Sequence, residues 1–167
     1  VSQASLYTKS SCPSVPVGWA KNNLKDKIRA IIVNSGNANA FTGRRGEADL
    51  YHILEYVAEM LNCEKEEIAV SSTGVIGEFL NTKSIIDALS GTKLSKESSW
   101  LEAAEAIMTT DTFPKLSFKN FLIDKSEINI LGIAKGSGMI EPNMGTMLSY
   151  IFTDANVDGS LLKSLLS

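Results

Sequence analysis

A stripe of apolar residues with helical spacing constrains the fold of this chain most strongly. From Glu47 onward, hydrophobic side chains recur at intervals of three and four residues. The positions are Leu50, Ile53, Leu54, Val57, Ala58 and Leu61. This period is typical of a helix that packs on one side only, and Asn62 is a residue type that ends helices. We therefore predict an amphipathic helix over this segment.

Strand-like runs lie on both sides of this helix. Ile28–Val33 and Ile68–Val70 are short runs rich in β-branched residues, and each leads into a polar, glycine-containing turn. Three further strands are predicted: 116–123 and 128–134, which flank the turn Asp124-Lys125-Ser126, and a run from Thr146 to about Thr153. Other helices are predicted at 82–89, closed by Gly91, at 161–166, and in a segment capped by Ser95 with Trp100, Ala104 and Ile107 on one face.

The order of these segments indicates the fold class. Strand and helix alternate early in the chain, and a hairpin follows later. This order favours an α/β domain with helices covering mixed sheets, rather than the all-parallel sheet of a doubly wound fold. A length of 167 residues suits one domain.

Composition argues against several function classes. A formal charge of −3, with scattered basic residues, argues against a nucleic-acid partner. No apolar run approaches the roughly 18 residues of a membrane-spanning helix. Cys12 and Cys63 lack CxxC spacing, so neither a zinc site nor a disulfide scaffold is indicated, and a reducing cytosol is the simplest compartment. No residues have metal-ligand spacing, and the single histidine, His52, falls at a helix-surface position, which argues against a His-based triad.

The segment 135–148, KGSGMIEPNMGTML, is a Gly-rich, Pro-broken loop that ends directly before an apolar run. Thr146 opens that run and follows Gly145, so its hydroxyl is placed to attack the Gly145 carbonyl. Cleavage there would give Thr146 a free α-amine, a known means of activating a threonine nucleophile. The alternative is that the glycines only form a turn and that Thr146 is an ordinary strand residue.

Four other polar features follow predicted strands or helices. Thr73 and Gly74 could supply two hydrogen-bond donors to an oxyanion, or could simply form a tight turn. The segment 34–40, NSGNANA, could bind a carboxylate or amide, or could satisfy its own backbone. The cluster 109–112, TTDT, either ends a helix or binds a ligand, and Lys135 either holds a substrate carboxylate or lies in water at a strand end.

Four of these segments together resemble the ornithine acetyltransferase (glutamate N-acetyltransferase) family of arginine biosynthesis. They are 34–40 (NSGNANA), 72–77 (STGVIG), 106–115 (AIMTTDTFPK) and 135–140 (KGSGMI) with 142–144 (PNM). Four long motifs in the family's order, spread over most of the chain, make the resemblance specific. It favours the chemical interpretation of Thr146, Thr73 and Gly74 over the turn and strand interpretations.

The resemblance implies a self-cleaving precursor, of which this chain is expected to be a part. Residues 1–145 would belong to an α chain that ends at Gly145, and 146–167 would begin a β chain. Thr146 would then take an acetyl group from N2-acetylornithine and pass it to glutamate, with acetyl-CoA as a second potential donor. By similarity, Thr73 and Gly74 form the oxyanion hole, while Thr109 and Lys135 contact substrate together with Thr146; Thr109 is preferred to Thr110 for its spacing from Lys135.

The family's fold is an αββα sandwich that resembles, without sharing their topology, the N-terminal nucleophile hydrolases. The resemblance further implies no bound cofactor or metal, α and β chains joined in a heterotetramer, and a cytoplasmic location, or the mitochondrial matrix in a eukaryote. Gly145 departs from the alanine expected before the scissile bond. Two alternatives stay open: an N-terminal-nucleophile aminopeptidase or amidohydrolase that uses water as acceptor, and an unprocessed, non-catalytic subunit.

Overall fold

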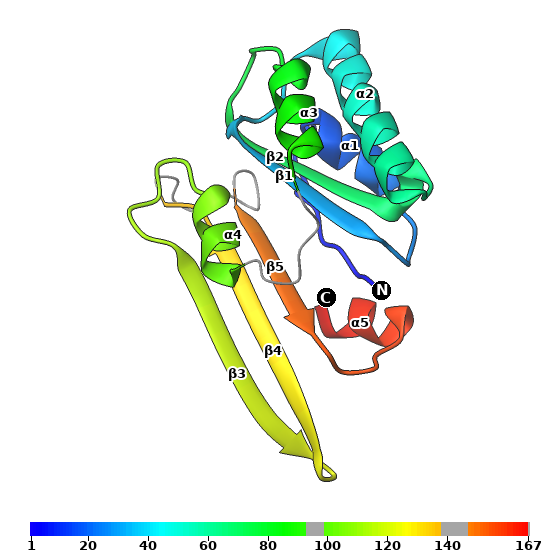
Figure 1. The fold of residues 1–167 in the computed structure, drawn as a ribbon, viewed down its shortest axis with the longest axis vertical. Coiled ribbons are helices and arrows are strands. Elements are labelled where there is room, and N and C mark those ends of the chain that lie inside the picture. The colour runs from blue at the N-terminus through cyan, green and yellow to red at the C-terminus, as the bar shows by residue number, and fades with distance from the viewer. Residues whose placement is uncertain (93–98, 138–146, 167) are drawn as a thin grey trace.

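Two separate sheets form the framework of the computed structural model, which describes residues 1–92, 99–137 and 147–166. The first sheet pairs β1 (Ala30–Asn37) with β2 (Ile68–Val75) in parallel, with Ala30 opposite Ile68. The second is antiparallel, in the order β3 (Lys115–Ile123), β4 (Ser126–Lys135) and β5 (Leu148–Thr153). Figure 1 shows the two sheets as separate layers. The predicted α/β class with mixed sheets and covering helices is confirmed.

The helices divide between the two sheets. Three of them pack together with the first sheet: α1 (Val15–Asn23), α2 (Gly43–Leu61) and α3 (Thr82–Ser90). In Figure 1, α2 and α3 lie on the side of β1 and β2 that faces away from the second sheet. The short helix α4 (Trp100–Ala106) packs on β3 and β4, and α5 (Gly159–Leu166) follows β5. A single 3-10 turn, Lys65–Glu67, leads from α2 into β2.

The stripe predicted from the sequence forms the larger core. Leu54 and Val57 of α2 are fully buried against Ile68 and Val70 of β2. Each such side chain contributes roughly 1.5–3 kcal/mol through removal from water. The helix ends as predicted at Asn62, which adopts the left-handed conformation with φ 48°.

A second core lies between α4 and the antiparallel sheet. It contains Ala104, Ile107, Leu131 and Ile133. The predicted cap of α4 is wrong: the helix begins after Ser99, whereas Ser95 lies outside the described residues. The Ser99 hydroxyl oxygen accepts from the N–H groups of Leu101 and Glu102, and the Glu102 carboxylate accepts from the Ser99 N–H. This reciprocal box is the stronger start signal.

Two further differences from the sequence prediction have local causes. The segments 34–37 and 71–74, predicted as turns, continue β1 and β2, because the parallel register runs on to Asn37 opposite Val75. Helix α1 was not predicted, since Pro16 and Gly18 weaken its helical pattern. Proline is tolerated there because the first-turn N–H groups of a helix have no intrahelical partner.

The predicted hairpin is confirmed. Strand β3 pairs with β4 from Lys115 opposite Ala134 to Ile123 opposite Ser126. Asp124 and Lys125 form the two-residue turn, and both have positive φ, 47° and 71°. Such turns match the right-handed twist of the paired strands. No helix in the described segments is long and apolar enough to cross a bilayer.

Candidate active site

Lys135 lies at the centre of a polar cluster between the two sheets. It ends β4 and, because side chains alternate along a strand, shares a face with Leu131 and Ile133. Only 2% of its surface is exposed. Its ammonium group donates to Thr109 Oγ1 at 2.7 Å and to Thr73 Oγ1 at 3.1 Å. Thr109 and Thr73, which precede Lys135 by 26 and 62 positions in the sequence, thus contact it in the structure. All three residues were selected from the sequence.

The alternation of β2 aims Thr73 at this cluster. Ile68 and Val70 point into the helix-covered core, so Thr73 points to the opposite face of the strand. It is buried, and the next residue, Gly74, has φ 133°. This conformation is open mainly to glycine. The backbone at Gly74 also approaches Gly36 closely, since a Cβ added at Gly74 would lie 2.2 Å from the Gly36 carbonyl carbon.

The loop after α4 presents Thr109, rather than Thr110, to Lys135. The hydroxyl of Ser35 on β1 donates to the carbonyl oxygen of Met108, which ties this loop to the first sheet. Thr110 instead shares a hydrogen bond of 3.2 Å with the hydroxyl of Ser137. Both threonines are exposed, and Thr109 is the one whose hydroxyl contacts the buried ammonium group.

Asp111 is a component of the site that sequence reasoning did not single out. Its carboxylate accepts from Lys115 Nζ at 2.7 Å and from the N–H groups of Gly136 at 2.7 Å and Thr109 at 3.3 Å. Lys135 Nζ lies 3.7 Å away. Burial alone would raise the pKa of this carboxyl, but the hydrogen bonds from Lys115, Gly136 and Thr109 hold its pKa far below the usual range. The sequence signal was the acid–base pair Asp111 and Lys115 within a non-helical segment.

Gly145 and Thr146 lie outside the described residues, but Met147, which follows Thr146 in the chain, is described. Leu148 pairs with Lys135 across β4 and β5, and Met147 lies beside Gly136. A Cβ added to Gly136 would be 3.6 Å from Met147 Cγ. The chain therefore enters β5 at the end of the sheet where Lys135 lies.

The amide-rich segment 34–40 binds the protein's own groups. Asn34 accepts from the Ser72 hydroxyl at 2.6 Å and donates to the Asn37 carbonyl at 2.8 Å. Asn39 is fully buried, donates to the Gly46 carbonyl and accepts from the Thr42 hydroxyl. These contacts support the interpretation in which the segment's polar groups bind the protein's own groups rather than a ligand. The segment holds β1 beside β2 and the start of α2.

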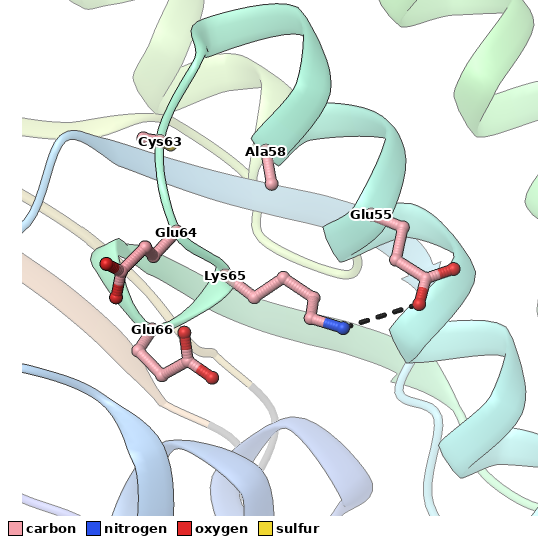
Figure 2. A pocket seen from close by; sticks show the side chains of 6 residues that line it. All are labelled: Glu55, Ala58, Cys63, Glu64, Lys65 and Glu66. Atoms are coloured by element: carbon pink, nitrogen blue, oxygen red, sulfur yellow. Dashed lines mark hydrogen bonds and ion pairs between the residues drawn. The ribbon is translucent and has the colours of Figure 1, made fainter.

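Two surface cavities lie away from the Lys135 cluster. One, of about 350 Å³, lies where α2 leads into β2, beside the Lys65–Glu55 ion pair (Figure 2). The other, of about 400 Å³, lies on the second sheet around Phe113, Gly132 and Ser149. Within the described ranges no group of three or more metal-ligating side chains gathers. His52 is exposed on α2, as predicted.

The chain is similar in sequence to curated proteins over nearly its whole length. The chain is 49% identical to the arginine biosynthesis bifunctional protein ArgJ of Bartonella henselae over 99% of its own length, and 45% identical to that of Gluconobacter oxydans over 98%. These alignments cover 41% and 39% of the two relatives. The chain therefore spans about two fifths of the curated relatives it matches.

Two solved structures resemble the fold. The crystal structure of ArgJ from Bacillus halodurans superimposes with a TM-score of 0.78 at 36% identity, over 89% of this chain and 78% of that one. Ornithine acetyltransferase from Mycobacterium tuberculosis, complexed with ornithine, gives 0.65 at 30% identity, over 88% and 78%. The ArgJ family model matches residues 1–167. The family predicted from four sequence motifs is thereby confirmed, and this chain belongs to the ArgJ family.

Proposed function

We propose that this chain forms part of a self-processing acetyltransferase of arginine biosynthesis, with Thr146 as its nucleophile. One observation carries the proposal: Lys135, Thr73 and Thr109 meet at the end of β4, beside the residue that follows Thr146. The relatives named ArgJ and the ornithine-bound neighbour support the substrate class. In this proposal residues 1–145 are α chain, and Thr146 begins the β chain.

Processing would begin with attack of Thr146 Oγ on the Gly145 carbonyl carbon. The peptide C–N bond breaks, the hydroxyl proton passes to the released amine, and an ester joins Gly145 to Thr146 Oγ. Water then hydrolyses the ester, leaving a carboxylate on Gly145 and a free α-amine on Thr146. Such an amine has a reference pKa near 7.7–8.0, so a fraction of it is neutral at pH 7 and can accept a proton.

Transfer of the acetyl group would proceed in two steps. Thr146 Oγ attacks the acetyl carbon of N2-acetylornithine, the amide C–N bond breaks, and ornithine leaves with the proton that the Thr146 amine relays. The α-amine of glutamate then attacks the acetyl-Thr146 ester. This releases N-acetylglutamate and restores the hydroxyl. Acetyl-CoA could donate the acetyl group in the same way, through cleavage of its thioester.

The described residues offer suitable groups for the transition state. Thr73 Oγ1 accepts a hydrogen bond from Lys135, so its own proton stays available to donate. The neighbouring ammonium group polarises this hydroxyl, which strengthens it as a donor to an oxyanion. We assign the second donor to the Gly74 N–H. Lys135 and Thr109 would hold the substrate carboxylate, because a buried cation with a hydroxyl beside it suits that group.

The proposal extends to assembly and compartment. We propose that processed α and β chains join in a heterotetramer in the cytoplasm. The cysteines Cys12 and Cys63 are both free thiols, which supports a reducing compartment. Native mass spectrometry of the full-length product would test the assembly, and a single uncleaved protomer would contradict it.

The decisive experiment compares the full-length protein with its Thr146→Ala variant. Intact mass and N-terminal sequencing should find two fragments in the wild type only, one of them beginning Thr-Met-Leu-Ser. Labelled acetylornithine should then give labelled N-acetylglutamate rather than free acetate. One uncut mass in both proteins would overturn the processing claim, and release of acetate alone would favour an amidohydrolase.

A further inference from the structure

The Asp111 carboxylate gathers donors from three separated parts of the chain. Its side chain has no exposed surface. The contacts come from its own loop (the Thr109 N–H), from the first residue of β3 (Lys115) and from the end of β4 with the residue after it (Lys135 and Gly136). A single side chain therefore links the loop that carries Thr109, both strands of the hairpin and the start of the segment that leads to Thr146.

The buried ammonium of Lys135 needs a counter-charge. Thr73 and Thr109 satisfy two of its N–H groups but carry no charge. Among the described residues, Asp111 is the one carboxylate within 4 Å of Lys135 Nζ. An unpaired buried ion costs several kcal/mol. Without this neighbour, Lys135 would gain by turning toward water and away from the two hydroxyls.

We propose that Asp111 is a positioning residue, which holds Lys135 Nζ between Thr73 and Thr109 and fixes the first peptide of the segment leading to Thr146. This inference rests on the proposed function, because it takes Lys135 as the group that receives the substrate carboxylate. Asp111 acts through its neighbours and does not touch substrate. Its two oxygens have different partners, since Oδ1 accepts from Lys115 and Gly136, while Oδ2 faces Lys135 and Thr109.

The chain offers a matched control. Lys115 also pairs with Asp111, but 32% of its side chain is exposed and it contacts Oδ1, whereas Lys135 lies nearest to Oδ2. A purely structural role would make the loss of Lys115 and the loss of Asp111 similar in effect. A positioning role makes only the second weaken ligand binding, because only Asp111 sets the place of Lys135.

The test uses full-length protein and ornithine as the probe, with affinity measured by calorimetry and kcat and KM measured for acetyl transfer. The variants are Asp111→Asn, Lys115→Met, Lys135→Met, and the doubles Asp111→Asn/Lys115→Met and Asp111→Asn/Lys135→Met. Urea unfolding of each variant separates stability from binding. The Asp111→Asn/Lys115→Met double restores the local charge balance, and so keeps the test usable if Asp111→Asn alone folds poorly.

Asp111→Asn should weaken ornithine binding and raise KM by about tenfold or more, as expected when one partner of a buried charge pair is lost. Lys115→Met should change either by less than about threefold. The Asp111→Asn/Lys115→Met double should regain stability but not affinity. In the Lys135→Met background, Asp111→Asn should add less than about threefold, because residues that act through one another are not additive.

Equal losses from Asp111→Asn in both backgrounds, or recovered affinity in the charge-balanced double, would overturn the inference. The proposed chemistry fails separately: wild type that binds ornithine but neither cleaves nor transfers overturns only the role of Thr146. Wild type that does not bind ornithine overturns both the substrate role of Lys135 and the positioning role of Asp111.

Discussion

Gly74 and Gly36 lie backbone to backbone where the two parallel strands end. The register pairs them directly, and a Cβ added to Gly74 would be 2.2 Å from the Gly36 carbonyl carbon and 2.5 Å from its oxygen. This approach leaves no room for a side chain at position 74. It also fixes the backbone directly after Thr73, whose hydroxyl contacts Lys135.

Replacing Gly74 with alanine should destabilise the protein by roughly 2 kcal/mol or more. The new methyl group would overlap backbone atoms, and φ 133° is strained for any residue with a side chain. Urea unfolding would measure the loss. The matched control is Gly132→Ala in β4, where an added Cβ meets nothing within 4 Å. Similar stabilities for the two variants would contradict the close contact between Gly74 and Gly36.

Two helical glycines should respond to alanine in opposite directions. At Gly46 in α2, an added Cβ would lie 1.9 Å from Thr42 Oγ1 and 2.4 Å from Asn39 Oδ1. That overlap breaks a buried hydrogen bond, so Gly46→Ala should cost roughly 2 kcal/mol or more. At Gly18 in α1 nothing lies within 4 Å, and Gly18→Ala should stabilise by about 0.5–1 kcal/mol. Thermal unfolding would compare them, and stabilisation by both would refute the tight packing at Gly46.

The sequence predicted those parts of the fold that depend on local patterns. The stripe on α2, the end of that helix at Asn62 and the hairpin turn after Ile123 each follow from neighbouring residues. The sequence predicts turns at the ends of β1 and β2, because both segments are polar and contain a glycine. The parallel pairing that runs from Asn34 opposite Ser72 to Asn37 opposite Val75, between residues distant in sequence, keeps them extended.

The residues of the candidate site also differ in how far the sequence could predict them. Thr73, Thr109 and Lys135 could be selected because their motifs resemble a family, not because their spacing shows that they meet. Asp111 lay inside one of those motifs, yet its role depends on Lys115, Gly136 and Lys135 arriving from two strands. A contact set of this kind has no periodic signature along the chain.

Acid should remove the stabilising effect of Asp111. The pKa of Asp111 is lower in the folded protein than in the unfolded chain, where an aspartate has a pKa of about 3.9. Its contribution to the free energy of unfolding is therefore fully present above about pH 3.9 and is progressively lost as the pH falls below that value. Among the described residues, the charged groups that face the carboxylate are the ammonium groups of Lys115 and Lys135. The difference in free energy of unfolding between wild type and Asp111→Asn should be constant between about pH 5 and about pH 7 and should shrink toward about pH 3. A difference that stays unchanged down to about pH 3 would show that the charge of Asp111 does not matter.

Thr109 and Thr110 provide an isosteric test of the site. The Thr109 hydroxyl accepts from the buried Lys135 ammonium at 2.7 Å, whereas Thr110 pairs with Ser137 on the surface. Thr109→Val keeps the shape of the side chain but removes the acceptor, so kcat/KM for acetyl transfer should fall by about tenfold or more. Thr110→Val should lower it by less than about threefold. Steady-state kinetics of the full-length protein would measure both. Equal losses would mean that contact with Lys135 does not distinguish the two hydroxyls, and a greater loss in Thr110→Val would move the substrate contact to Thr110.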